Sequence, residues 1–218
     1  MRDKVIKQIL NTKIITIVRG VDKRYLQPLL EALYSGGIRL MEITFKMDDR
    51  DSFYETAREI EFLREIAGKR MHIGAGTVTS VPLVELAHSA GAEFIISPNV
   101  NTDVIQKTRE LNMVSIPGAL TPTEVLTAHD AGADFIKLFP AGSMGPEYLK
   151  ALHDGPMGHI LYIAASGVSI ENIADYMAAG ACGAGISSGI VKKEWIDTGK
   201  FEKITELAQQ FISNANAG

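Results

Sequence analysis

The chain has 218 residues, 46% of them hydrophobic, which is enough to fill one large core without disulfides or metals. Its 22 Lys and Arg residues against 26 Asp and Glu leave a net charge of −4. No basic excess exists to neutralise the phosphates of a nucleic acid, so we expect no nucleic-acid partner.

A single cysteine, Cys182, excludes a disulfide within the chain and favours a reducing compartment. It lies among small residues with no His close in sequence, which indicates a buried thiol rather than a nucleophile. Residues 1–7 are basic, but no apolar signal-peptide run follows them. No stretch reaches the ~20 apolar residues of a membrane helix. The sequence therefore predicts a soluble cytoplasmic protein with no membrane partner.

Short apolar stretches alternate with longer amphipathic segments along the whole chain. The stretches predict strands at residues 14–18, 40–44, 72–75, 94–97, 114–116, 135–138, 160–164 and 183–186. The segments predict helices near residues 25–35, 52–67, 82–89, 102–111, 122–130, 146–153, 170–178 and 201–214, with an extra helix at 3–10. Cap residues Thr121 and Ser169, each followed closely by an acid, support two of these helix starts.

Strands that are apolar on both faces and joined by helices indicate a parallel sheet. Eight such pairs in about 200 residues favour a closed (β/α)8 TIM barrel with an additional N-terminal helix. No linker or low-complexity stretch divides the chain, so residues 1–218 are expected to form a single barrel domain. The alternative is a doubly wound open sheet.

A repeated junction ends every second helix and sets the phase of the strand that follows. It reads SGGI (35–38), SAGA (89–92), DAGA (130–133) and AAGA (178–181), with a glycine that can take positive φ just before the strand. Five residues past that glycine lie Glu42 and Lys137 on two strands, and Ile96 and Gly185 on the other two. Alternate strands of a barrel supply each interior layer, so Glu42 and Lys137 should point inward at about the same height.

An acid and a lysine in one interior layer could be an ion pair that fills the barrel. Such pairs give little net stability, because the cost of removing both charges from water offsets their attraction. Both residues also lie toward the C-terminal ends of their strands, where barrel enzymes place their chemistry. We therefore favour a catalytic pair. Burial between Ile136, Leu138 and Phe139 should lower the pKa of Lys137 and leave an amine that adds to a ketone, with Glu42 moving the protons.

Five segments around these two residues resemble the 2-keto-3-deoxy-6-phosphogluconate / 4-hydroxy-2-oxoglutarate aldolase family. FIKLFPA (135–141) resembles its Schiff-base strand and MEITFK (41–46) its acid/base strand. GAGTV (74–78), IISP (95–98) and IPGALTPTE (116–124) resemble its third, fourth and fifth strands. The match runs in order over nearly the whole chain, which makes the five motifs together a specific signal.

The resemblance implies a class I aldolase that cleaves a 2-keto-3-deoxy (phospho)sugar acid or 4-hydroxy-2-oxoglutarate. The products would be pyruvate and an aldehyde, glyceraldehyde 3-phosphate or glyoxylate. It implies no metal, no cofactor and a homotrimer. By position, Thr77 and Lys46 would hold the pyruvate carboxylate, and Pro98 and Phe139 would flank the methylene side. Arg19 is either a further anion contact or one member of a surface salt bridge.

Two departures from the family concern substrate binding. Lys46 stands where the family usually has Arg, and a lysine lacks the planar fork that grips a carboxylate. The turns that would bind phosphate are also altered, and their candidate residues are Ser166, Gly167, Ser188 and Gly189. Their glycines and serines still allow phosphate binding. We therefore favour a phosphorylated substrate over a non-phosphorylated keto acid.

Other chemistries find less support in the residues. The five histidines lack metal-ligand spacing. The pentad GISSG (185–189) resembles a hydrolase elbow, but no His follows His159, as that order of catalytic residues requires. Two alternatives to the aldolase remain: a sugar-phosphate isomerase or epimerase with Glu42 as base, and a non-catalytic barrel that binds a small acid.

Overall fold

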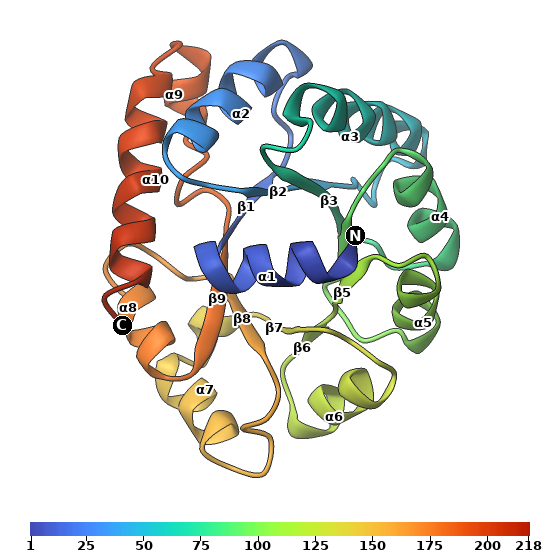
Figure 1. Cartoon of the computed structure of the whole chain (residues 1–218), viewed down its shortest axis with the longest axis vertical. Helices are drawn as coiled ribbons and strands as arrows, with labels where there is room; N and C mark the ends of the chain where they lie inside the picture. Colours follow the sequence, from blue (N-terminus) through green and yellow to red (C-terminus); the bar gives the residue numbers. More distant parts are fainter.

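The apolar stretches form one parallel sheet that curves into a barrel surrounded by helices (Figure 1). The computed structural model describes residues 1–218, apart from the side chain of Arg50. The strands are β1 (Ile14–Val18), β2 (Leu40–Thr44), β3 (His72–Gly76), β4 (Phe94–Ile96), β5 (Val114–Ile116), β6 (Gly118–Ala119), β7 (Ile136–Leu138), β8 (Tyr162–Ala165) and β9 (Ala181–Ile186). Their order in the sheet is β5-β4-β3-β2-β1-β9-β8-β7-β6. The predicted barrel class is confirmed.

Nine strands serve eight βα units because Pro117 divides the fifth strand into β5 and β6. Proline has no N–H to give to a ladder, so it interrupts the regular pairing. Its carbonyl still accepts the backbone N–H of Lys137 at 2.9 Å, and Ser97 N–H donates to the carbonyl of Ile116 at 3.3 Å. The two parts of the fifth strand therefore connect β4 on one side of the barrel to β7 on the other.

The helices follow the predicted spacing closely. They are α1 (Arg2–Thr12), α2 (Leu26–Ser35), α3 (Phe53–Ala67), α4 (Val81–Ser89), α5 (Thr102–Glu110), α6 (Pro122–Asp130), α7 (Pro146–His153), α8 (Ile173–Ala178), α9 (Lys193–Asp197) and α10 (Phe201–Ala215). Single turns of 3-10 helix lie at Lys23–Tyr25, Arg50–Ser52 and Ala141–Ser143. The four junction glycines, Gly37, Gly91, Gly132 and Gly180, all have positive φ, between 86° and 106°.

Two local predictions about helices were incomplete. Helix α8 begins at Ile173, later than the cap at Ser169 suggested. The Asn172 side chain binds the backbone N–H of Ser169 and the carbonyl of Gly167, and this turn delays the helix. The short α9 was not predicted at all. Thr121 does form the expected cap, with a reciprocal bond from Glu124.

The apolar core is divided into two clusters by the sheet. The larger cluster fills the space between the barrel and the surrounding helices. The smaller one fills the barrel interior with strand residues such as Ile15, Phe94 and Ile163. Two residues of α1, Val5 and Ile9, join this inner cluster and are fully buried. Helix α1 therefore closes the N-terminal end of the barrel, across which it lies in Figure 1.

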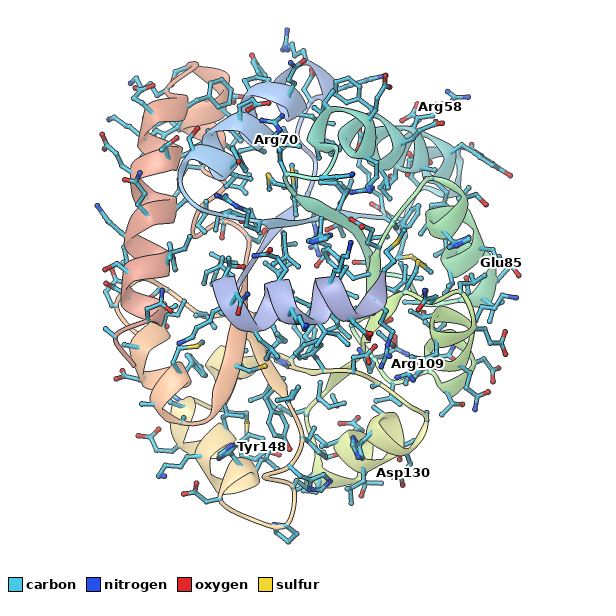
Figure 2. The ribbon with its side chains drawn as sticks, viewed as in Figure 1. Arg58, Arg70, Glu85, Arg109, Asp130 and Tyr148 are labelled. Carbon is cyan, nitrogen blue, oxygen red and sulfur yellow. The ribbon has the colours of Figure 1, made fainter. Side chains whose placement is uncertain are left out.

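An ion cluster holds α1 against the sheet. Asp134, just before β7, accepts from the guanidinium groups of Arg2 and Arg109 and from the backbone N–H of Ser115. Its side chain is 3% exposed. Arg109, labelled in Figure 2, reaches this acid from the end of α5. With one end closed in this way, the opposite end is left for a functional site.

No helix among the described residues combines the length and apolarity needed to cross a membrane.

Candidate active site

The C-terminal ends of the strands surround a cavity of about 360 Å³. Its lining combines side chains from six strands or the loops that directly follow them. The lining residues are Ile17, Arg19, Glu42, Thr77, Lys137, Phe139, Ala165, Ser166, Gly167, Val168, Gly185, Ser187, Ser188 and Gly189. All the site residues expected from the sequence are among them except Lys46 and Pro98. The interior layer predicted from the helix-end glycines therefore brings Glu42 and Lys137 into one cavity.

Lys137 stands in the middle of β7, and its amine lies 4.5 Å from the centre of the Phe139 ring. Burial lowers the pKa of Lys137, the charge of Arg19 lowers it further, and Glu42 opposes the shift. The prediction that Ile136 and Leu138 bury this amine is wrong. Ile136 and Leu138 face the outer helices, because neighbours on a strand point to opposite sides.

Glu42 is 2% exposed and has only one partner among the described side chains. Its Oε1 accepts a hydrogen bond from Thr44 Oγ1 at 3.1 Å, whereas Oε2 has no hydrogen-bond partner among the residues that the structure describes. Burial raises the pKa of Glu42, and both Lys137 and the bond from Thr44 oppose that rise. An unpartnered buried carboxylate oxygen is costly, so its presence indicates a role other than stability.

The two pKa shifts act in the same chemical direction. Burial favours the neutral amine of Lys137 and the protonated acid of Glu42. A neutral amine has the lone pair that attacks a carbonyl, and a protonated acid can release a hydroxyl group as water. Ionisable groups whose pKa values are shifted by burial commonly lie together in active sites.

Glycine at position 76 makes room for Glu42, a feature that the sequence analysis missed. A β-carbon there would overlap the Glu42 carboxylate, and its three nearest atoms all belong to that side chain. In the sheet register Glu42 is opposite Gly74 and Thr44 is opposite Gly76. The sequence did contain a signal for this space. Gly74 and Gly76 are two residues apart, so both face the barrel interior on the strand next to the one that carries Glu42.

Two cavity residues have left-handed backbone conformations that are unfavourable for side chains other than glycine. Thr77 has φ of 58° and follows β3, and Ser166 has φ of 71° and follows β8. The two other such residues, Lys13 and Asn112, instead follow the ends of helices. Backbone strain of this kind costs about 1–3 kcal/mol and concentrates at functional sites. The strained backbone therefore indicates that Thr77 and Ser166 belong to a functional site.

The loop after β8 rests directly on the loop after β7. The backbone N–H of Gly142 donates to the carbonyl of Ser166 at 2.7 Å. A β-carbon at Gly167 would lie 2.5 Å from Gly142 Cα, so no other residue fits without displacing one loop. This contact fixes the Ser166–Gly167 turn next to the strand that carries Lys137.

Lys46 and Pro98 lie outside the cavity that holds Lys137. Lys46 instead lines a separate cavity of about 250 Å³ together with Lys23 and Glu59. Strand β2 ends at Thr44, so the inward phase that places Glu42 does not extend to Lys46. Pro98 follows β4, and its backbone packs so closely on Gly118 that a β-carbon there would meet it at 2.5 Å.

The remaining chemistry-bearing residues have structural surroundings. Cys182 donates to the carbonyl of Tyr162 at 3.1 Å, and burial raises the pKa of its thiol to about 12. The thiol is half-buried, and its raised pKa leaves little thiolate, which agrees with the expectation that it is not a nucleophile. Within the described part of the chain, no three His, Cys, Asp or Glu side chains gather as metal ligands would. The GISSG segment forms the end of β9 and the loop after it, as predicted.

The family model described as KDPG and KHG aldolase matches residues 5–207. The chain belongs to the KDPG and KHG aldolase family.

Relatives within the family include proteins that act on two related sugar acids. A probable 2-dehydro-3-deoxy-6-phosphogalactonate aldolase of Rhizobium meliloti is 36% identical over 82% of each chain. A 2-dehydro-3-deoxy-phosphogluconate aldolase of Treponema pallidum is 32% identical over 85% of each. A solved structure titled as native KDPGal is 30% identical, with a TM-score of 0.83 over 93% of this chain and 94% of that one. As a member of this family the protein is a lyase, an aldolase of the Schiff-base type.

Proposed function

We propose that Lys137 is the Schiff-base lysine and Glu42 the general acid and base of this aldolase. The observation that carries the proposal is their shared cavity, in which burial favours a neutral amine and a protonated acid. The substrate is a 2-keto-3-deoxy sugar acid or 4-hydroxy-2-oxoglutarate, which is cleaved to pyruvate and an aldehyde.

The reaction begins when the lone pair of the Lys137 amine attacks the C2 carbonyl of the substrate. Glu42 gives a proton to the resulting hydroxyl, which leaves as water and produces the iminium. The carboxylate of Glu42 then removes the proton of the C4 hydroxyl. The C3–C4 bond breaks, the aldehyde leaves, and the bonding electrons move into the iminium to give an enamine.

Protonation of that enamine at C3 by Glu42 gives the pyruvate iminium. Water then hydrolyses it, which releases pyruvate and restores the amine of Lys137. The unpartnered Oε2 of Glu42 supports this proton-transfer role, because it is free to face the substrate while Thr44 holds Oε1.

Arg19 and Thr77 would bind the pyruvate carboxylate, since both line the cavity. Phe139 would flank the methylene side, next to the amine. The roles expected for Lys46 and Pro98 stay predictions that depend on the family resemblance, and Lys46 would have to leave its own cavity to reach the substrate.

A phosphate on the substrate would bind at the Ser166–Gly167 turn and at Ser188 and Gly189. All four residues line the Lys137 cavity, and Gly167 allows a close backbone approach. The names of the two relatives, which both act on phosphorylated sugar acids, support this assignment.

We also propose that the protein is a cytoplasmic homotrimer that acts on a free small molecule. The family resemblance supports the trimer, and the single free cysteine fits a reducing compartment. Light scattering coupled to gel filtration measures the assembly directly. A mass of one or two chains contradicts the trimer.

Pyruvate and borohydride test the Schiff base. Intact mass followed by peptide mapping should find one reduced pyruvate adduct, at Lys137. The matched control is Lys137→Met with the surface lysines unchanged, which should take up none. An adduct spread over surface lysines, or none at all, would refute the assignment.

Turnover assays identify the substrate. We expect cleavage of 2-keto-3-deoxy-6-phosphogluconate or its galactonate epimer with higher kcat/KM than the same sugar acids without phosphate. Ser188→Ala should reduce the ratio of kcat/KM for the phosphorylated acids to kcat/KM for the non-phosphorylated acids. A higher kcat/KM for the non-phosphorylated acids would instead assign the turn residues another role.

A further inference from the structure

A second groove lies at the closed end of the barrel, beside α1 and away from the Lys137 cavity. Its volume is about 590 Å³. Its lining comes mainly from α1, from the end of α3 and from the start of β3, and α1 lies across the end of the barrel that faces the viewer in Figure 1. Its lining residues are Met1, Lys4, Lys7, Gln8, Asn11, Arg64, Gly68, Lys69, His72 and Glu93.

The one carboxylate in this lining is already engaged. Glu93 Oε2 lies 2.7 Å from Arg64 Nη1 and 3.0 Å from His72 Nδ1. The Glu93 side chain is 7% exposed, so it faces these partners more than the open groove. Arg64 therefore balances the charge of Glu93, and the groove keeps the charge of its remaining cations.

Those cations are Lys4 and Lys7 on α1 and Lys69 after α3. All three are exposed, and none forms an ion pair with a described side chain. Lys4 and Lys7 are three residues apart, so they lie on one face of the helix. A solvated helix face explains lysines on α1 alone. It does not explain why a third lysine, Lys69 from another element, lines the same groove.

The surplus of positive charge contrasts with the net charge of −4 for the whole chain. The three ammonium groups line one groove, and an anion with several charges would be attracted to all of them. Side-chain amides of Gln8 and Asn11 add hydrogen-bond donors to the same lining. The volume is that of a small-molecule site rather than of an interface with a macromolecule.

We propose that this groove binds a small anion with two or more phosphoryl groups. Lys4 and Lys7 would contact one end of the anion and Lys69 the other, which would link α1 to the α3–β3 connection. The shared chemistry is a chain of phosphoryl groups, from either an inorganic polyphosphate or a nucleoside triphosphate. The site is independent of the aldolase reaction, because it shares no residue with the Lys137 cavity.

Calorimetric titration of the full chain with tripolyphosphate, and separately with ATP, tests the proposal. We expect binding by the unmodified protein that weakens as salt is added. The double variant Lys4→Ala/Lys69→Ala should bind at least about tenfold more weakly, since it loses two charge-assisted contacts. Both residues are exposed and form no ion pair with a described side chain, so the variant should fold normally.

Two control variants make the result specific. Lys200→Ala/Lys203→Ala removes the same charge at the start of α10, outside the groove, and should bind as the unmodified protein does. Arg19→Ala removes a cation of the Lys137 cavity and should also leave binding unchanged. Tighter binding of ATP than of tripolyphosphate assigns the groove to a nucleotide, and equal binding assigns it to the phosphoryl chain alone.

Three results overturn the proposal. They are no binding by the unmodified protein, equal weakening in both lysine double variants, and a loss of binding confined to Arg19→Ala. The last would place the anion in the barrel mouth.

Discussion

Replacing Gly76 by alanine should inactivate the enzyme by displacing Glu42. The added β-carbon would overlap the Glu42 carboxylate and would lie 2.8 Å from its Cγ. Carbon atoms pack at about 3.5 Å or more, so Cγ must retreat by roughly 0.7 Å and the carboxylate by more. The hydrogen bond from Thr44 to Oε1 then breaks, because it depends on the present position of that oxygen.

The magnitude follows from how little space surrounds Glu42. The side chain is 2% exposed, so it moves only by entering the cavity or straining its rotamer. Overpacking of this kind costs about 1–3 kcal/mol of stability. Loss of a positioned general acid or base lowers turnover about 10²–10⁴-fold. We therefore expect a folded protein with an unfolding free energy lower by about 1–3 kcal/mol and a kcat reduced at least about 100-fold.

A mutant cycle between Gly76→Ala and Glu42→Gln shows whether the loss acts through Glu42. Steady-state kcat is measured for both single variants and for the double variant. The double variant should be no slower than Glu42→Gln alone. Gly185→Ala is the matched control, since its β-carbon would face Ile17 Cδ1 at 3.1 Å across the same cavity. Its effect should add to that of Glu42→Gln. A normal kcat for Gly76→Ala, or additive losses in the cycle, would refute the reasoning.

Three further predictions concern charge. Arg19→Gln removes a cation that helps to lower the pKa of Lys137, so that pKa should rise. The acidic limb of the pyruvate–borohydride labelling rate, plotted against pH, should then move to higher pH. A limb that moves to lower pH contradicts this prediction. The double variant Glu42→Leu/Lys137→Met should be inactive yet more stable in urea by about 1–4 kcal/mol at pH 7, because it removes the buried carboxyl group of Glu42 and the partly buried amine of Lys137. Lower stability than that of the unmodified protein would count against a catalytic role for the pair. Asp134→Asn should lower the unfolding free energy by about 1–3 kcal/mol. Asp154→Asn, in an exposed ion pair, should change it by less than about 1 kcal/mol. Equal losses in the two variants would show that the Asp134 cluster stabilises the protein no more than an exposed ion pair does.

The sequence determined the barrel and the two residues that we propose as its catalytic pair. Eight apolar stretches at regular spacing predict a parallel barrel, because every strand in such a sheet is covered on both faces. The helix-end glycines set the strand phase, since only a residue that tolerates positive φ fits there. That phase alone placed Glu42 and Lys137 in one interior layer, and both do line one cavity.

Only the tertiary structure decided what surrounds that pair. The position of Lys46 depends on where β2 stops, and a periodic pattern does not specify the path of the chain beyond its last paired residue. The space for Glu42 depends on Gly76 of the neighbouring strand, a contact set by register between strands. The pKa shifts of Glu42 and Lys137 come mainly from burial by distant segments. Local sequence sets the conformation of each element, whereas burial and neighbours across the barrel exist only once the chain has closed.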